Sequence, residues 1–526
     1  MRREFTRRVW ILVSLVFFAG PQGLSSQEDP GTYEVGKALP PEVEGRPTVP
    51  MTLEDAMDLA LTQNLDIRSA RLAPRIQEYG LAAAEAVFDP TISSTLSYNN
   101  SSTQSTSQLD GGQRIETERA AYNASIAQTL PWYGGRLSAD FNNGRTESTN
   151  SFSVLNPNYN SNLSLNYTQP LLAGLKTDNQ RAGVRTQRLQ GEISEIQLTA
   201  RTENIRSQVR VAYWALRASI DQIEIQRQNL AQARELLEQN RIRVRLGSMS
   251  ELQVIQAEAQ VANAEQALLN AEVQWRNQEL VFKSLLVSGP GDPLFQQTVN
   301  PTELPAVTAP EVDLPAAVER AMEERTDLRQ QRRQRQITEV ELAVTRNSTL
   351  PDLNLTAGYS LRGVGGDRYE RSGLGGEAIL IEEGGYGDAL DSLWDRDTPT
   401  WNLSLNFSYP IGNAASRANL ERARLQMEQT DLALQAQELA VVTQVTDAGL
   451  AVRDTYLQFQ AAQRSREVAE RSAEIELTRF RVGAATNYEV MLAQNGVTSA
   501  RLSELRALIN HANAVAEFQR VQRIGG

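Results

Sequence analysis

Apolar residues alternate with small polar residues along six short segments of the chain. Each segment is about ten residues long, the length with which a tilted strand crosses a bilayer. The apolar positions are, in chain order, Ile92, Leu96 and Tyr98; Tyr122, Ala124, Ile126 and Leu130; Leu137, Ala139 and Phe141; Leu163, Leu165 and Tyr167; Leu353, Leu355, Ala357, Tyr359 and Leu361; and Trp401, Leu403, Leu405, Phe407 and Tyr409. A soluble sandwich shows the same alternation, but here the opposite faces are Ser, Asn and Thr, which leaves no second core to fill. The pattern predicts strands of a membrane β-barrel.

Two long proline-free segments, Thr177–Arg245 and Ala414–Arg481, are filled with strong helix formers. Each would form a rod of about 100 Å. Both rods end at a short glycine-containing turn, from which a second helix returns. These turns and returning helices are Leu246–Ser250 with Glu251–Val287, and Val482–Ala484 with Thr486–Arg523. We therefore predict two long coiled-coil hairpins.

The returning helix over 251–287 has apolar stripes on two faces. One stripe is Leu252, Ile255, Ala259, Ala262, Leu269 and Val273, and the other is Val254, Ala257, Val261, Ala264, Leu268, Ala271 and Trp275. A helix with two apolar stripes needs neighbours on both sides. This favours a closed cylinder of helices over an ordinary antiparallel bundle, which remains the alternative.

The chain is internally duplicated. A shift of 261 residues places Leu53–Pro90 over Leu314–Pro351 without a gap. The identical positions include Leu53, Ala56, Ala60, Asp66, Arg71, Ile76, Glu78, Leu81, Ala82 and Pro90 of the first copy. We expect two repeats, residues 51–287 and 314–526, with a proline-rich linker over 288–313. In the first repeat, a short helix would run to about Val87. Stacked end to end, this helix and the returning helix would together be about as long as the long rod.

The N-terminus has the pattern of a secretory signal peptide over residues 1–26. Four arginines precede an apolar run, Val9–Ala19, which is too short to span a bilayer. A flexible leader is expected over residues 27–50. Loss of residues 1–26 would remove four Arg and one Glu and move the formal charge from −12 to −15. An exported chain this acidic is a poor candidate for binding nucleic acid.

The connections between the predicted strands differ in length. Long polar segments, 99–118 and 362–399, are expected to be weakly structured loops on the outside, because barrel proteins place long loops there. The short turn Pro131–Gly135 would face the periplasm, with Trp132 and Tyr133 in the aromatic girdle.

Little in the sequence points to catalysis. The chain has no cysteine and one histidine, His511, which is expected on a helix surface without a metal. No phosphate-binding glycine loop occurs, so any energy source would belong to a partner. We predict no enzyme activity and no cofactor.

These features resemble the TolC family of outer-membrane efflux proteins over nearly the whole chain, from Thr52 to about Arg523. The motifs are the Thr52–Asn64 opening, the junctions where a strand ends in proline before a long helix, and the glycine turns at 243–247 and 479–483. The resemblance implies a homotrimer with a β-barrel in outer-membrane lipid and an α-helical tunnel in the periplasm. It also implies a periplasmic adaptor that bridges to an inner-membrane transporter.

The resemblance also assigns roles to residues near the hairpin turns. Two sets of residues would be the adaptor-docking tips: Leu246, Gly247 and Ser248, and Val482, Gly483 and Ala484. Each glycine would in any case be needed to close its turn. At the gate, Gln253 and Phe480 replace charged and tyrosine residues of the family, so the ionic lock is absent. We expect closure by packing around Phe480 and ion preference set by a ring of three Glu489.

The strand number departs from the family pattern of four per protomer. The segment 119–150 reads as an extra hairpin and brings the number to six, and the sequence does not decide whether it enlarges the barrel. The main hypothesis is a passive export duct. The alternatives are a periplasmic coiled-coil adaptor or tether, and a stand-alone porin that would leave the helices unexplained.

Overall fold

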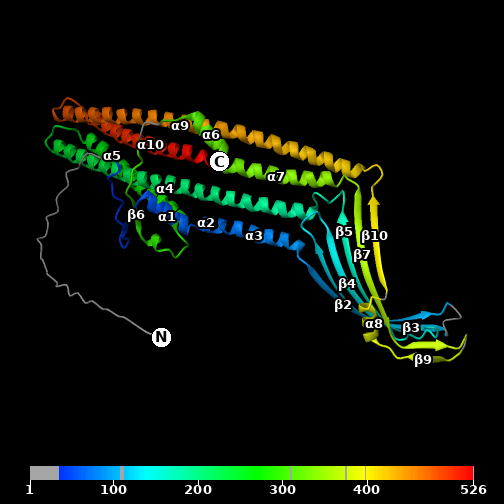
Figure 1. Ribbon diagram of the computed structural model, residues 1–526. Helices are drawn as coiled ribbons and strands as arrows, with labels where there is room; N and C mark the ends of the chain where they lie inside the picture. The colour runs from blue at the N-terminus through cyan, green and yellow to red at the C-terminus, as the bar shows by residue number, and fades with distance from the viewer. Residues whose placement is uncertain (1–34, 107–111, 308–310, 374–375, 397, 525–526) are drawn as a thin grey trace, which may run out of the picture.

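The computed structural model describes residues 35–106, 112–307, 311–373, 376–396 and 398–524. The predicted signal peptide over residues 1–26 lies outside the described residues, as does the first part of the leader. The molecule is elongated, with a layer of long helices at one end and a sheet at the other (Figure 1).

The helical part contains two long helices, each with a shorter helix that returns beside it. The long helices are α4 (Asn179–Arg245) and α9 (Ala414–Arg481), and the returning helices are α5 (Glu251–Leu286) and α10 (Asn487–Val521). The predicted hairpins are confirmed, with bounds that differ by at most two residues.

Short helices open each repeat and stack on the end of a returning helix (Figure 1). They are α1 (Leu53–Gln63), α2 (Leu65–Ala70), α3 (Leu72–Glu85) and the 3₁₀ turn η1 (Ala86–Phe88) in the first repeat, and α6 (Leu314–Glu324) and α7 (Thr326–Asn347) in the second. The prediction of one continuous helix to Val87 was wrong, because the helix breaks at Asn64.

The break recurs at the equivalent position of the second repeat, Arg325, and the two residues have ψ of 126° and 128°. The Asn64 side chain donates to the Leu285 carbonyl at 2.9 Å, and the Arg325 guanidinium donates to the Val521 carbonyl at 3.2 Å. Both breaks are therefore fastened to the end of a returning helix. Contacts with that helix override the local helix propensity.

Six antiparallel strands form one sheet in the order β10-β7-β5-β4-β3-β2. The strands are β2 (Thr91–Gln104), β3 (Arg114–Thr129), β4 (Arg136–Ser148), β5 (Asn158–Pro170), β7 (Asp352–Gly365) and β10 (Pro399–Ser408). The six predicted strands are confirmed. The extra hairpin is β3 and β4, and it lies inside the sheet between β2 and β5.

The two segments expected as weakly structured loops contain more regular structure than predicted. The β2–β3 ladder continues to Gln104 and Arg114, so most of residues 99–118 is strand. Residues 362–399 contain the end of β7, the hairpin β8 (Arg368–Arg371) and β9 (Ala378–Glu382), and helix α8 (Tyr386–Trp394). The polar residues 99–104 and 114–118 show no apolar alternation, yet they pair as strands because the ladder is made by backbone hydrogen bonds.

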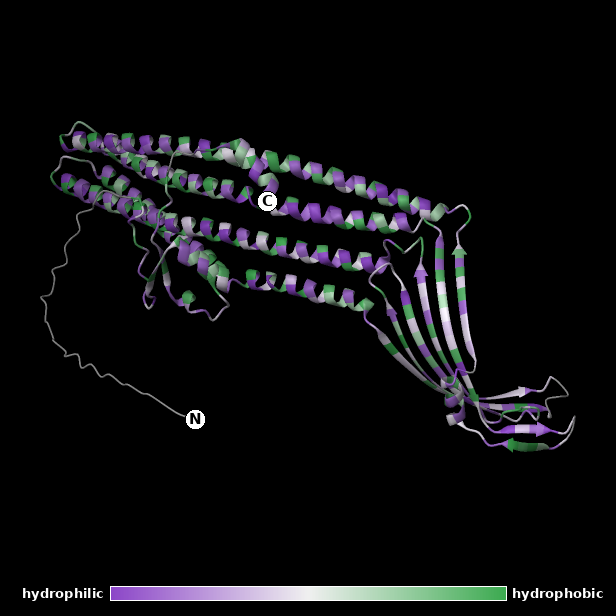
Figure 2. Ribbon diagram, in the orientation of Figure 1, coloured by the Kyte–Doolittle hydropathy of each residue, from purple (hydrophilic) through white to green (hydrophobic). Residues whose placement is uncertain are grey.

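The ladder register places the apolar positions of all six strands on one face of the sheet. Ile92 lies opposite Ile126, Ile126 opposite Ala139 and Ala139 opposite Leu165. On the other side of β5, Leu165 lies opposite Tyr359, and Tyr359 opposite Trp401. The strands accordingly alternate in hydropathy along their length (Figure 2). A one-residue slip of any strand would move its apolar residues to the polar face.

Parts of the predicted leader and linker are ordered against the helices. Strand β1 (Thr48–Met51) pairs in parallel with β6 (Thr298–Pro301), which follows the 3₁₀ turn η3 (Pro293–Gln296). The buried Arg217 of α4 binds Asp221 at 2.8 Å and donates to the carbonyls of Ala38 and Pro301. Burial raises the pKa of the Asp221 carboxyl despite its arginine partner. From Ala38 onward the leader therefore contacts the helices, and its backbone groups help to satisfy a buried ion pair.

The helices form a layer in which each contacts its neighbours along much of its length. Near the tips α4 and α10 lie between α5 and α9, and near the sheet the order is α3, α4, α7 and α9 (Figure 1). The two stripes predicted on α5 differ in burial. Ala257, Ala264, Ala271 and Trp275 are buried, whereas Leu252, Ile255, Leu269 and Val273 are exposed in the single chain.

His511 is not a helix-surface residue as expected. Its side chain on α10 is 2 % exposed, its ring lies beside Tyr456 and its Nδ1 is 3.2 Å from the Thr455 hydroxyl of α9. Burial lowers the pKa of His511. A single histidine gave no sign in the sequence of which face of α10 would pack on α9.

Candidate functional site: the hairpin tips and the strand-to-helix junction

Both hairpin tips have the same glycine-centred hydrogen-bond pattern. At the first tip Gly247 (φ +72°) donates to the Val244 carbonyl at 2.9 Å, and Ser248 donates to the Arg243 carbonyl at 2.9 Å. This is a Schellman motif, in which the residue after the helix adopts a left-handed conformation.

The second tip repeats this arrangement with other residues. Gly483 (φ +81°) donates to the Phe480 carbonyl at 3.1 Å, and Ala484 donates to Arg479 at 2.7 Å. The residue before each glycine is apolar and exposed, Leu246 by 75 % and Val482 by 76 %. The six residues predicted as docking tips therefore form two matching exposed turns at one end of the molecule (Figure 1).

Glu489 takes part in the cap of α10. Its carboxylate accepts from the backbone N–H of Thr486 at 2.5 Å, and its own N–H donates to the Thr486 hydroxyl at 3.3 Å. Hydrogen bonds to the carboxylate from the backbone N–H and the hydroxyl of Thr486 lower the pKa of the Glu489 carboxyl. The capping box thus holds this exposed carboxylate at the N-terminus of α10.

Phe480 lies inside the protomer and is 1 % exposed. It packs against Leu236 of α4 and Val490 of α10. The Arg243 guanidinium lies 4.1 Å from the centre of the Phe480 ring and also donates to the Phe480 carbonyl at 3.3 Å. Phe480 therefore joins the two hairpins of one chain just above their tips. Gln253, the third predicted gate residue, is half-buried in the first turn of α5.

A buried amide pair missed by the sequence reasoning lies beside Phe480. Asn240 of α4 donates to the Asn487 side chain of α10 at 2.9 Å, and both residues are almost fully buried. Asparagines are common on exposed helix faces, so their pairing could not be read from the chain.

Farther from the tips, a charged cluster binds α4, α9 and α10 together. Arg501 bonds Glu470 at 2.8 Å and Gln228 at 3.0 Å, and Arg466 bonds Glu504 at 2.7 Å. Burial raises the pKa of the Glu504 carboxyl. This cluster was also missed, because its members lie on three helices that are distant in sequence.

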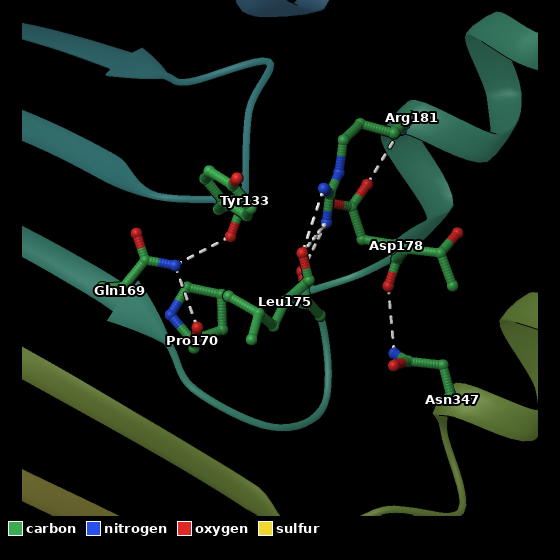
Figure 3. A network of polar contacts seen from close by, with 9 residues as sticks. Tyr133, Gln169, Pro170, Leu175, Asp178, Arg181 and Asn347 are labelled. Atoms are coloured by element: carbon green, nitrogen blue, oxygen red, sulfur yellow. Dashed lines mark hydrogen bonds and ion pairs between the residues drawn. The ribbon is translucent and has the colours of Figure 1, made fainter.

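A polar network holds the junction where β5 becomes α4 (Figure 3). Asp178 caps α4 by accepting from the Arg181 N–H at 2.8 Å, and the Arg181 guanidinium donates to the Leu175 carbonyl at 3.1 Å. Asn347 at the end of α7 donates to the Thr177 carbonyl at 3.0 Å. The network fixes the bend between sheet and helices, because it satisfies the backbone groups exposed there.

The same network reaches the turn of the extra hairpin. Gln169 at the end of β5 donates to the Tyr133 carbonyl at 2.8 Å (Figure 3). Trp132 and Tyr133 themselves are exposed, and their place in an aromatic girdle stays a prediction.

Within the described ranges, no group of three or more His, Cys, Asp or Glu side chains could hold a metal ion. In the same residues, no helix combines the length and the apolar character needed to span a membrane.

Two helical hairpins with glycine tips, joined to a sheet with one apolar face, define the class of outer-membrane efflux channels. The chain belongs to the outer membrane efflux protein family, whose model matches residues 113–286 and 317–521. The predicted resemblance, the outer-membrane location and the efflux-channel function are confirmed by this match. It decides against the adaptor and stand-alone porin alternatives.

Solved structures share the fold at low sequence identity. The outer-membrane channel OprN is 16 % identical, with a TM-score of 0.65 and 90 % of each chain covered. The CmeC outer-membrane channel of Campylobacter jejuni is 17 % identical, with a TM-score of 0.61 over 89 % of this chain and 85 % of that one. VceC of Vibrio cholerae is 15 % identical, with a TM-score of 0.61 over 89 % and 95 %. No curated protein matches the sequence significantly.

Proposed function

We propose that three copies of the chain close into a passive duct from the periplasm to the outside. The observation that carries this proposal is that both edges of the single chain are unpaired. The sheet ends in β2 on one side and β10 on the other, and each edge strand leaves a row of backbone groups that no other described strand pairs with. Pairing β2 of one copy with β10 of the next would close the sheet.

The edge helices support the same closure. Helix α9 has an exposed apolar stripe whose members are spaced by seven or eleven residues: Leu425, Leu432, Leu439, Leu450, Leu457, Val468 and Ile475. Such spacing keeps all of them on one side of a helix. At the opposite edge, the exposed stripe of α5 is equally unpartnered. Burial of each stripe against the next copy would remove a large apolar surface from water.

Engineered disulfides test the closure, because the chain has no cysteine of its own. Ile255 of α5 and Ile475 of α9 lie on opposite edges at similar heights above the tips. We expect oxidation of the I255C/I475C variant to produce covalent trimers. The single variants I255C and I475C are the controls and should stay uncrosslinked. Further cysteine pairs can be placed at other matching heights of α5 and α9. If all of these double variants remain monomeric on a denaturing gel, the result would contradict the duct.

The two exposed tips would dock a periplasmic adaptor that bridges to an inner-membrane pump. Their exposed Leu246 and Val482 offer small apolar contacts, and the two turns present the same backbone shape. In this proposal the pump supplies the energy for transport. Co-purification from cells with an affinity tag on this chain tests the assembly, and loss of the partners in an L246E/V482E variant is the expected result.

The gate would be closed by packing around Phe480, with a ring of three Glu489 setting ion preference. Because Phe480 joins α9 to α4 and α10 within one chain, its role would be to hold the two hairpins together while the tips meet at the axis. Conductance in planar bilayers tests the ring. We expect the E489Q variant to lose cation selectivity while Q253E keeps it, and unchanged selectivity of E489Q would remove the ring from the proposal.

A further inference from the structure

The extra hairpin changes the proportions of sheet and helices. Near the junction four helices, α3, α4, α7 and α9, lie side by side, and they connect to β2, β5, β7 and β10. Helices α3 and α4 are neighbours, yet β2 and β5 are separated by β3 and β4. The sheet is therefore two strands wider than four helix-to-strand connections require.

The two added strands make the sheet about as wide as the layer of four helices, because neighbouring strands lie closer together than neighbouring helices. Packed helices lie about 9 Å apart, so three steps across four helices span about 27 Å. Strands are about 4.8 Å apart and tilted by about 40° in a barrel, so each takes up about 6 Å of the perimeter. Five steps across six strands then span about 31 Å, whereas three steps across four strands would span only about 19 Å.

The hairpin is built into the sheet on all sides. The pairing of β3 with β2 covers fourteen residue pairs, from Thr91↔Ala127 to Gln104↔Arg114. Its apolar positions face the same side as those of the flanking strands, and its turn is held at the junction by Gln169. At the turn Gly134 lies so close to the Gly174 carbonyl that a Cβ would come within 2.8 Å of that oxygen. These contacts hold β3 and β4 in the sheet between β2 and β5.

We infer that the outer-membrane ring of this protein has eighteen strands and a bore as wide as the helical tunnel. This inference rests on the proposed trimer, since it multiplies the six strands of one chain by three. The polar face that would line the bore is built from small side chains, as in the rung Ser93, Ser125, Asp140, Ser164, Ser360 and Thr400. Such a ring would pass bulky solutes, so that cargo size is limited at the tips and not in the membrane.

Electron cryomicroscopy of the full chain in lipid nanodiscs tests the strand number directly. A trimer whose ring contains eighteen strands is the expected result. A trimer with twelve strands would overturn this inference and leave the proposed duct intact. A particle that is not a trimer would overturn the proposed duct and the strand number together.

Polymer access tests the width of the bore. Deleting Arg114–Ser148 would remove β3 and β4, leave β2 antiparallel to β5 and keep the apolar residues of both on one face. Polyethylene glycols of increasing size are added from the extracellular side of a planar bilayer. Barrel diameter grows roughly linearly with strand number, so the largest polymer that enters should fall in radius by about a third. An unchanged limit in an assembled deletion variant would show that the hairpin does not widen the bore.

Discussion

Single residues fix the points where the long helices reverse. Gly247 and Gly483 hold a left-handed conformation that side chains with a Cβ adopt only at a cost. Neither glycine has an atom within 4 Å of the place where a Cβ would stand, so crowding is not the reason for glycine. The backbone conformation alone requires it. The properties of His511, in contrast, depend on the residues that pack around its side chain and not on its backbone conformation.

We expect the G483A variant to be destabilised by about 1–2 kcal/mol, the cost of a left-handed residue with a Cβ. The matched control is G183A in the first turns of α4, where space is equally open and the backbone is helical. Alanine is the better helix former there, so G183A should gain up to about 1 kcal/mol. Denaturant unfolding of both variants checks the opposite signs, and equal shifts would disprove the conformational argument.

The pH dependence of stability includes a contribution from His511. Its pKa in the folded state lies below the ordinary value of 6.5 because it is buried. The neutral form is therefore favoured by folding, and its contribution to stability is complete above pH 6.5 and is lost as the pH falls below that value. We expect the unfolding midpoint of the wild type to drop between pH 7 and pH 5 by more than that of the H511Q variant. Parallel pH curves for the two proteins would contradict this.

At the scale of elements, alternation and register together make a two-faced sheet. Each strand alone shows only a period of two, but the ladder brings the apolar residues of six strands to the same side. Polar residues on the other side are small, which suits a hydrated lining better than a packed core. Consecutive residues of one strand therefore lie on opposite faces of the sheet, one apolar and one polar.

Adjacent substitutions in β10 test this difference. Leu405 lies on the apolar face and Asn406 on the polar face. An arginine that faces lipid near the bilayer midplane costs about 2–4 kcal/mol. We expect L405R to lower the yield of assembled protein in the outer membrane, while N406R, with the same added charge, assembles normally. The amount of protein that migrates as a folded oligomer on an unheated gel measures the effect.

At the scale of the whole molecule, the single chain is incomplete at its edges. The core that the chain forms alone lies between its helices, as in the cluster around Tyr213, Trp275 and Phe282. The stripe on α9 remains outside that core, and Leu457 at its middle is 61 % exposed. In the proposed trimer, contacts between copies would therefore contribute to stability.

A charge on this stripe should prevent assembly without unfolding the chain. We expect the L457E variant to elute as a monomer in detergent with its helical content retained, because the substitution removes one apolar anchor from the interface. The Q458E variant adds the same charge at the next residue of α9 and should remain an oligomer. Light scattering after gel filtration distinguishes the two. An oligomeric L457E would show that the stripe does not form the interface.

Much of the fold was predictable because its signals are local. Helix propensity and the glycine turns defined both hairpins, and the alternation of Leu163, Leu165 and Tyr167 with polar residues defined a strand without tertiary information. The breaks at Asn64 and Arg325 were missed, since each depends on a bond to the end of a returning helix more than 190 residues away.

The candidate site also contains features that could be predicted from the sequence and features that could not. The tips were predictable because the left-handed glycine belongs to the turn itself. The contact of Phe480 with Arg243, the Asn240–Asn487 pair and the cluster around Arg501 were not, because each joins helices whose relative rotation is set only by packing.

The sequence by itself determined the elements, their order and which face of each is apolar, because these follow from periods of two and 3.6 along the chain. The tertiary structure alone decided that β3 and β4 lie inside the sheet and that one stripe of α5 is buried while the other is exposed. The physical reason is that a period specifies a face but not its partner. Partners are chosen by packing and hydrogen bonding between segments that are distant in the chain.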